Sequence, residues 1–250
     1  MNSKTFHKII QLNKDFYKRV GDEFSNTRQS PWGGWTKILG LMKKQFKDEK
    51  KISILDLGCG NGRLYGYLKE ELPQYQFNYL GVDSSKLLLT RAKRFYKSSN
   101  VKFELNDVIL KTQSIQKHYD IVAAFGLTHH IPSKKYREKW FKEISSLVRK
   151  NGLFVFTIWD FSKDERFKNL VKSIKTDDVN ISVNELEGGD SFLGWQNMKN
   201  VYRYFHKYSS DELKTISNIL IKSNMKIVVK FYADGKSGNL NCYFIWRKTS

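Results

Sequence analysis

The stretch Ile52–Gly62, with the sequence ISILDLGCGNG, decides the fold of this chain. A mostly apolar run leads into three glycines, which let the backbone turn tightly and approach a ligand without a Cβ in the way. Asp83 stands at the end of the next apolar run, Phe77–Val82. A glycine-rich turn after one strand and a carboxylate at the tip of the next are typical of a site for an adenosine-bearing cofactor at the edge of a parallel sheet.

The composition suits one α/β domain. The chain has 250 residues, of which 40% are hydrophobic, enough for a sizeable core. Its two cysteines, Cys59 and Cys242, argue against a disulfide framework and favour a reducing, cytoplasmic setting. No Cys/His pair has zinc-ligand spacing, and no apolar run has the length of a signal peptide or a membrane span. We therefore expect neither a metal nor a membrane partner.

The chain is strongly basic. It has 44 Lys and Arg residues against 25 Asp and Glu residues, which gives a formal net charge of +19. A field of this sign attracts polyanions and favours nucleic acid as a partner, although a genomic bias toward Lys, Asn and Ile codons would also raise the charge. The predicted helix Lys86–Lys97 carries five bases and no acid. It is either a solvated face or a track for phosphates.

Strand and helix patterns alternate through the middle of the chain. This alternation predicts right-handed βαβ units and a doubly wound, Rossmann-like α/β fold, in which a C-terminal hairpin completes a seven-stranded mixed sheet. The predicted strands are Ile52–Leu57, Phe77–Val82, Val101–Leu105, Tyr119–Phe125, Gly152–Trp159, Met225–Tyr232 and Asn241–Trp246. The predicted helices are Lys4–Val20, Trp35–Phe46, Gly62–Glu71, one from Ser84-Ser85 to Lys97, Ser133–Arg149 and Ser209–Ser223.

The same pattern predicts a single domain in four parts. Residues 1–50 form an N-terminal helical cap, and residues 51–159 form the cofactor-binding core. Residues 160–208 break the alternation and are expected as an irregular insertion over the carboxyl edge of the sheet, where ligands bind. Residues 209–250 supply the closing helix and hairpin.

The cofactor is better matched by S-adenosylmethionine than by a dinucleotide. The NAD pattern G-x-G-x-x-G fails at Arg63, whereas G-x-G-x-G fits. S-adenosylmethionine has no phosphates but carries an ammonium group, and Asp56 beside the turn suits that cation. Asp83 can accept hydrogen bonds from two ribose hydroxyls. Asn106 and Asp107 end the third strand, where they can reach an adenine edge.

These residues closely resemble the class I S-adenosylmethionine-dependent methyltransferases. The resemblance covers about Ile52–Trp159 and includes LDLGCGNG, GVDSS, Asn106-Asp107 and YDIVAAF. It implies that Gly58, Cys59 and Gly60 cradle the methionine part, and that S-adenosylhomocysteine is the product. The predicted cofactor-binding residues are Asp56, Gly58, Cys59, Gly60, Asn61, Asp83, Ser84, Asn106, Asp107 and Phe125.

Three further segments concern the acceptor. They are YKRVGDEFSNTRQSPW at Tyr17–Trp32, GLTHHIPS at Gly126–Ser133, and GGDSFLGW at Gly188–Trp195 followed by VYRYFHKY at Val201–Tyr208. Together they look like the family that methylates the carboxymethyl group on the wobble uridine of tRNA. The positions that match its motifs are Arg28, Asp190, Trp195, Arg203, Tyr204 and His206.

The chain departs from that family in three places. Gly194 stands where the family usually has proline, Phe205 replaces a tyrosine, and a longer tryptophan-containing motif is reduced to Trp159-Asp160. The resemblance nevertheless implies tRNA as the substrate. Because eukaryotic relatives work with a small activator protein, it also implies such a protein as a further partner.

A carboxymethyl group explains the absence of a catalytic triad in the sequence. Its carboxylate is already ionised near pH 7, so the enzyme needs only to align oxygen, methyl and sulfur. The residues expected to hold it are Arg203, His206, Tyr204, Arg28 and Asp190. Arg203 and His206 are three apart, and such residues share one face in a helical turn but lie on opposite faces of a strand.

Several alternatives stay open at the level of sequence. Arg28 and Arg203 would also suit surface ion pairs. His129 and His130 either line the pocket or only shape their loop, and Trp32, Trp35 and Trp195 are either core or a platform for stacking a base. The rival functions are a small-molecule O- or N-methyltransferase and a non-catalytic RNA-binding subunit. The intact glycine turn and its carboxylates argue against the second.

Overall fold

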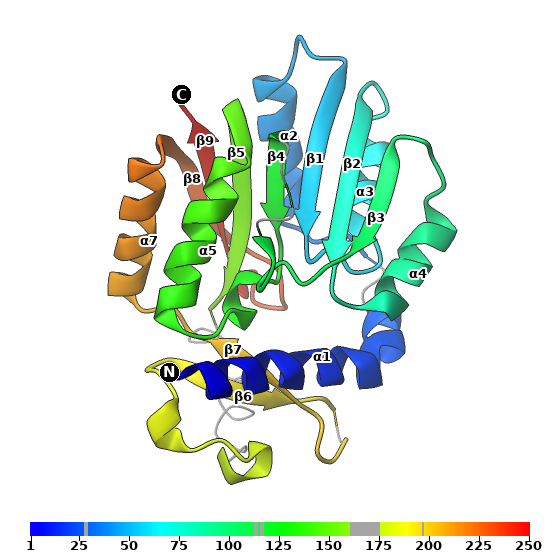
Figure 1. Ribbon diagram of the computed structural model, residues 1–250. Coiled ribbons are helices and arrows are strands. Elements are labelled where there is room, and N and C mark those ends of the chain that lie inside the picture. Colours follow the sequence, from blue (N-terminus) through cyan, green and yellow to red (C-terminus); the bar gives the residue numbers. More distant parts are fainter. Residues whose placement is uncertain (28–29, 113–114, 116–117, 161–175, 197) are drawn as a thin grey trace.

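The computed structural model describes residues 1–27, 30–112, 115, 118–160, 176–196 and 198–250. Its main sheet has seven strands: β1 (Lys51–Leu57), β2 (Gln76–Asp83), β3 (Val101–Leu105), β4 (Tyr119–Ala124), β5 (Val148–Trp159), β8 (Met225–Ala233) and β9 (Asn241–Lys248). They lie in the order β3-β2-β1-β4-β5-β9-β8, and only β9 runs antiparallel to its neighbours (Figure 1). The predicted Rossmann-like, seven-stranded mixed sheet is confirmed.

Helices cover both faces of this sheet. They are α2 (Trp35–Gln45), α3 (Arg63–Glu71) and α4 (Lys86–Phe95) on one face, and α5 (Lys134–Ser146) and α7 (Ser210–Lys222) on the other. Short 3₁₀ turns occur at η2 (Thr128–His130), η4 (Thr176–Val179) and η5 (Val183–Glu185). Every residue of β4 is buried, as expected for a central parallel strand that is covered on both sides.

The N-terminal helix α1 (Ser3–Asn26) crosses below the carboxyl ends of the parallel strands (Figure 1). It extends six residues beyond the predicted end at Val20. A Cβ at Gly21, the first residue past the predicted end, would lie 2.7 Å from the Leu87 side chain. The glycine therefore permits a close contact with α4 rather than a helix stop. The extra turns bring Phe24, Ser25 and Asn26 to the edge of the sheet where ligands bind.

The stretch expected to be irregular contains a regular ribbon. Strands β6 (Asp190–Gly194) and β7 (Tyr202–His206) pair antiparallel and lie beneath α1 (Figure 1). Asn13 of α1 ties the ribbon to the helix, because its side chain accepts from the Tyr204 backbone nitrogen at 2.7 Å and donates to the Tyr204 carbonyl at 3.4 Å. The insertion thus forms the floor of the site with a fixed strand register.

Candidate cofactor and acceptor site

The glycine turn after β1 is held by the neighbouring strand. The backbone nitrogens of Gly58 and Cys59 donate to the Val82 carbonyl at 2.8 and 3.1 Å. Gly58 and Gly60 have φ values of +74° and +55°, which disfavour residues with a Cβ. A Cβ at Gly60 would meet only Leu88, at 3.9 Å, so this part of the turn opens onto free space.

Asp83 links the turn to the following helix. Its Oδ2 accepts from the Gly60 backbone nitrogen at 2.9 Å, and its Oδ1 accepts from Ser85 at 2.7 Å. Burial raises the pKa of this carboxyl, while these backbone hydrogen bonds oppose the rise. The side chain also lines the pocket, where its remaining lone pairs can accept from the hydroxyls of a ribose.

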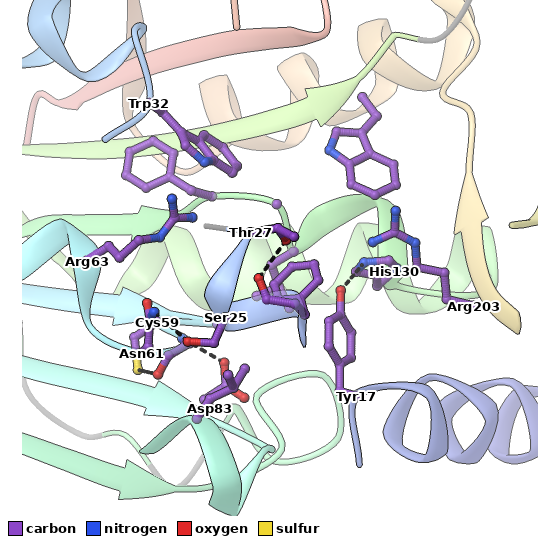
Figure 2. Close-up of a pocket in the computed structure, with 18 of the residues that line it drawn as sticks. Tyr17, Ser25, Thr27, Trp32, Cys59, Asn61, Arg63, Asp83, His130 and Arg203 are labelled. Atoms are coloured by element: carbon purple, nitrogen blue, oxygen red, sulfur yellow. Dashed lines mark hydrogen bonds between the residues drawn. The ribbon is translucent and has the colours of Figure 1, made fainter. Parts of the chain in front are cut away.

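A cavity of about 1210 Å³ opens above this turn. At one end Asp83, Asn61 and Cys59 gather around the glycine turn, and at the other end Tyr17, His130 and Arg203 lie together (Figure 2). Such a space accommodates a nucleoside cofactor and an acceptor group side by side. The sequence-predicted cofactor residues that line it are Gly58, Cys59, Gly60, Asn61, Asp83, Ser84, Asp107 and Phe125.

Asp56 and Asn106 have a different placement. The Asp56 carboxylate is buried and accepts a hydrogen bond from the Tyr79 hydroxyl, and neither Asp56 nor Asn106 is among the residues that line the cavity. Burial, partly offset by this hydrogen bond, raises the pKa of Asp56 to about 7. The expected contact between Asp56 and a cofactor ammonium is therefore not part of the site as observed. Strand alternation turns this side chain into the core beneath the turn.

Helix α1 covers the cofactor end of the cavity. Lys14 pairs with Asp107 at 2.8 Å, and Ser25 accepts from Asn61 at 2.9 Å. Tyr17 and Ser25 lie within the acceptor-related segment Tyr17–Trp32 but were not among the predicted site residues. Helical periodicity alone does not show which end of a helix reaches a site. Only the match of this segment to a known motif could have identified the two residues from the sequence.

Arg203 is the main charged group at the acceptor end. It is 5% exposed, and its guanidinium carbon lies 4.6, 5.3 and 5.8 Å from the ring centroids of Trp159, Phe16 and Trp195. Its Nε and Nη1 have no hydrogen-bond partner, and no described carboxylate pairs with it. Burial lowers the pKa of Arg203, an effect that the Tyr17 hydroxyl opposes as a hydrogen-bond acceptor. An anionic ligand would offset the desolvation free energy of this buried cation.

His130 also lines the cavity and contacts two neighbours. Its Nδ1 lies 2.7 Å from the Tyr204 carbonyl, and its Nε2 lies 3.1 Å from the Tyr17 hydroxyl. His129 is fully buried and stacks on Trp159, with ring centroids 3.7 Å apart. Of the two histidines, His130 faces the site and His129 supports the tryptophan that lies beside Arg203.

The comparisons with known proteins agree on the domain. Residues 54–152 match the family described as "Methyltransferase domain". A methyltransferase of Encephalitozoon cuniculi is 24% identical over 204 residues, which are 79% of this chain and 80% of that protein. The mouse tRNA (carboxymethyluridine(34)-5-O)-methyltransferase is 23% identical over 155 residues, which are 61% of this chain but only 20% of the mouse protein.

Solved structures share the whole fold. An S-adenosylmethionine-dependent methyltransferase from Clostridium acetobutylicum superposes with a TM-score of 0.62 at 16% identity, covering 94% of this chain and 99% of that one. The N-methyltransferase NodS from Bradyrhizobium japonicum, in complex with S-adenosylhomocysteine, gives 0.60 at 12% identity and covers 96% and 99%. The matched family and the shared fold together support an S-adenosylmethionine-dependent methyltransferase domain. Its open glycine turn and the Asp83 carboxylate fit that cofactor.

The other predicted acceptor residues are separated from Arg203 by the fold. Because β7 is a strand, His206 and Tyr204 lie on the face opposite Arg203. Tyr204 donates to Asp190 at 2.6 Å, and His206 contacts Asp190 at 2.7 Å and Glu212 at 3.0 Å. These residues form a buried network under the ribbon and are not among those that line the cavity. The expectation that Arg203 and His206 act on one substrate required a turn here, and the strand removes it.

The carboxylates around His206 favour its charged form. Since carboxylates only accept hydrogen bonds, both ring nitrogens donate when the imidazole is protonated. Burial alone would lower the pKa of His206, but the bonds to Asp190 and Glu212 outweigh it and raise the pKa.

The remaining expectations concern Arg28, the tryptophans, and metal or membrane features. Arg28 lies outside the described residues. Trp195, which matches the tRNA-related motif, and Trp32 both line the cavity, whereas Trp35 packs in the core beside Trp32. Within the described ranges, no group of three metal-ligating side chains was found, and none of the helices has the length and hydropathy to cross a membrane.

Proposed function

We propose that this methyltransferase esterifies the carboxylate of a carboxymethyl group on the wobble uridine of tRNA. The observation that carries the proposal is Arg203, a buried guanidinium at the acceptor end of the cavity that has no ionic partner among the described residues. Burying an unpaired charge costs roughly several kcal/mol. A substrate carboxylate would supply the missing partner. The surrounding rings exclude water and strengthen that pairing.

Bound S-adenosylmethionine supplies a methyl group that its positive sulfur already activates. The residues of this chain then position the two reactants, because Asp83 and the glycine turn fix the cofactor end and Arg203 fixes the acceptor. A carboxylate held by Arg203 would be an already ionised nucleophile toward the methyl group that the cofactor would supply, and the electron pair of the broken carbon–sulfur bond would remain on sulfur. No proton moves, so no general base is required.

The surroundings of the cavity support a nucleic acid as the carrier of this carboxylate. The net charge is +19, and the solvent side of α4 exposes Lys86, Lys93 and Arg94. Phosphate contacts of this kind position an RNA without reading its sequence. The similarity to the mouse tRNA methyltransferase points the same way. We infer the cytoplasm as the setting, in line with two free cysteines.

Labelled methyl transfer from S-adenosylmethionine tests the proposal. The acceptors are tRNA that carries 5-carboxymethyluridine, tRNA without it, and a panel of small carboxylic acids. The proposal expects transfer to the first alone, and expects Arg203→Ala to abolish most of it. Arg247→Ala, at an exposed arginine on β9, is the matched control and should retain activity. Transfer only to small acids would replace tRNA with a small-molecule substrate, and transfer to unmodified tRNA would exclude the carboxylate.

A further inference from the structure

The hydrogen bonds of His130 fix where its proton lies. A carbonyl oxygen only accepts, so the 2.7 Å contact with the Tyr204 backbone requires a hydrogen on Nδ1. In the neutral ring Nε2 is then an acceptor, and the 3.1 Å contact requires Tyr17 to donate its hydroxyl proton there. Both ring nitrogens are thus occupied, and the Tyr17 proton is engaged by His130. Figure 2 shows Tyr17 aimed at His130, with Arg203 beside the pair.

The groups around His130 keep it neutral. Tyr17 faces it from α1, Arg203 faces it from β7, and His129 precedes it in η2. Burial and then the Arg203 charge lower the pKa of His130 to about 3. Hence the tautomer described above persists at every pH at which the enzyme is expected to work.

We propose that Tyr17 and His130 are specificity-determining residues that restrict the acceptor to groups already anionic in solution. This inference rests on the proposed methyl transfer at the Arg203 site. A neutral hydroxyl must lose a proton as its oxygen bonds to the methyl carbon, and His130 Nε2, the imidazole acceptor beside Arg203 in the described part of the site, is already engaged by Tyr17. Arg203 only donates, and its charge disfavours an ammonium acceptor. A carboxylate needs neither a base nor a protonation change.

The same pair protects the nucleophile. Because Tyr17 gives its proton to His130, its oxygen offers lone pairs to Arg203 and no donor to the substrate. A freed Tyr17 hydroxyl would instead donate to the bound carboxylate and stabilise it before reaction. Such ground-state binding lowers KM without helping the transition state.

Two substitutions separate this role from simple packing. His130→Gln keeps an acceptor for Tyr17, whereas His130→Leu removes it. With 5-carboxymethyluridine tRNA, we expect His130→Leu to lower both KM and kcat by about tenfold, the effect of one added hydrogen bond. His130→Gln should stay within about threefold of the parent, as should the control His118→Leu at an exposed histidine. Equal loss of kcat in both His130 variants, or a raised KM in His130→Leu, would contradict the inference.

A second measurement does not depend on turnover. Nitrogen NMR of histidine-labelled protein should show one ring, assigned through its loss in His130→Gln, with hydrogen on Nδ1 and unchanged between about pH 5 and 8. Titration of that ring in this range would overturn the inference. So would wild-type transfer to 5-hydroxymethyluridine at a rate near that for 5-carboxymethyluridine. Transfer to small carboxylic acids but not to tRNA would instead overturn only the proposed tRNA substrate.

Discussion

Replacing Arg203 by methionine should leave the protein at least as stable and make it less active. The guanidinium is 5% exposed and pairs with no carboxylate in the described part of the chain, so folding carries its desolvation cost. Exchanging even a buried ion pair for apolar side chains of similar volume is often neutral or stabilising by about 1–4 kcal/mol, and a buried charge without a carboxylate partner has less to lose. Each kcal/mol corresponds to about 2–4 °C in Tm for a chain of this size. Arg203→Met should therefore leave Tm unchanged or raise it.

The effect on catalysis has the opposite sign. Truncating one member of a buried charge pair costs about 2–5 kcal/mol, because the other charge is left unpaired. The expected loss in kcat/KM for 5-carboxymethyluridine tRNA is about 30- to 5000-fold. Thermal unfolding and initial-rate methylation of Arg203→Met, with Arg247→Met as control, provide both numbers. A fall in Tm together with activity would mean that Arg203 is structural, and activity within about threefold of the parent would refute the carboxylate contact.

Three further outcomes are expected. Asp83→Asn should weaken S-adenosylmethionine binding by about 1.5–3 kcal/mol in calorimetry, because an amide replaces an oxygen that accepts hydrogen bonds; unchanged affinity would exclude the ribose contact. The affinity for tRNA should fall log-linearly with salt, and neutralising Lys93 and Arg94 should reduce the slope by about 0.7–0.9 for each phosphate that these side chains no longer neutralise; an unaltered slope would remove α4 from the RNA surface. Because the pKa of His206 is raised in the folded state, the residue stabilises the fold fully at pH values below its unfolded pKa of about 6.5. This stabilisation is lost as pH rises through the folded pKa. Denaturant unfolding should show that loss in the parent but not in His206→Gln.

The core of the fold followed from the sequence because its signals are local. Apolar runs ending in glycines or carboxylates marked the parallel strands, and Ser85 marked the start of α4, where it caps the Leu88 nitrogen. The β6–β7 ribbon gave no such signal. It is held by contacts with α1 that are distant in sequence, such as Asn13 with the Tyr204 backbone.

The site was partly predictable for the same reason. Residues on the turn and strand tips, such as Asp83 and Gly60, line the cavity as expected. Asp56 does not, since strand alternation places it in the core beside Tyr79. The pairing of Tyr17 with His130 joins a helix to a loop 113 positions away in the chain, and no pattern in either segment encodes it.

The central claim is that a carboxylate on wobble uridine accepts the methyl group. Mass spectrometry of nucleosides from tRNA incubated with the purified chain and S-adenosylmethionine tests it most directly. We expect 5-carboxymethyluridine to decline as its methyl ester appears, and expect mild alkali to reverse the change because the product is an ester. A methylated nucleoside that resists alkali, or 5-carboxymethyluridine that persists unchanged while another acceptor is methylated, would contradict the claim.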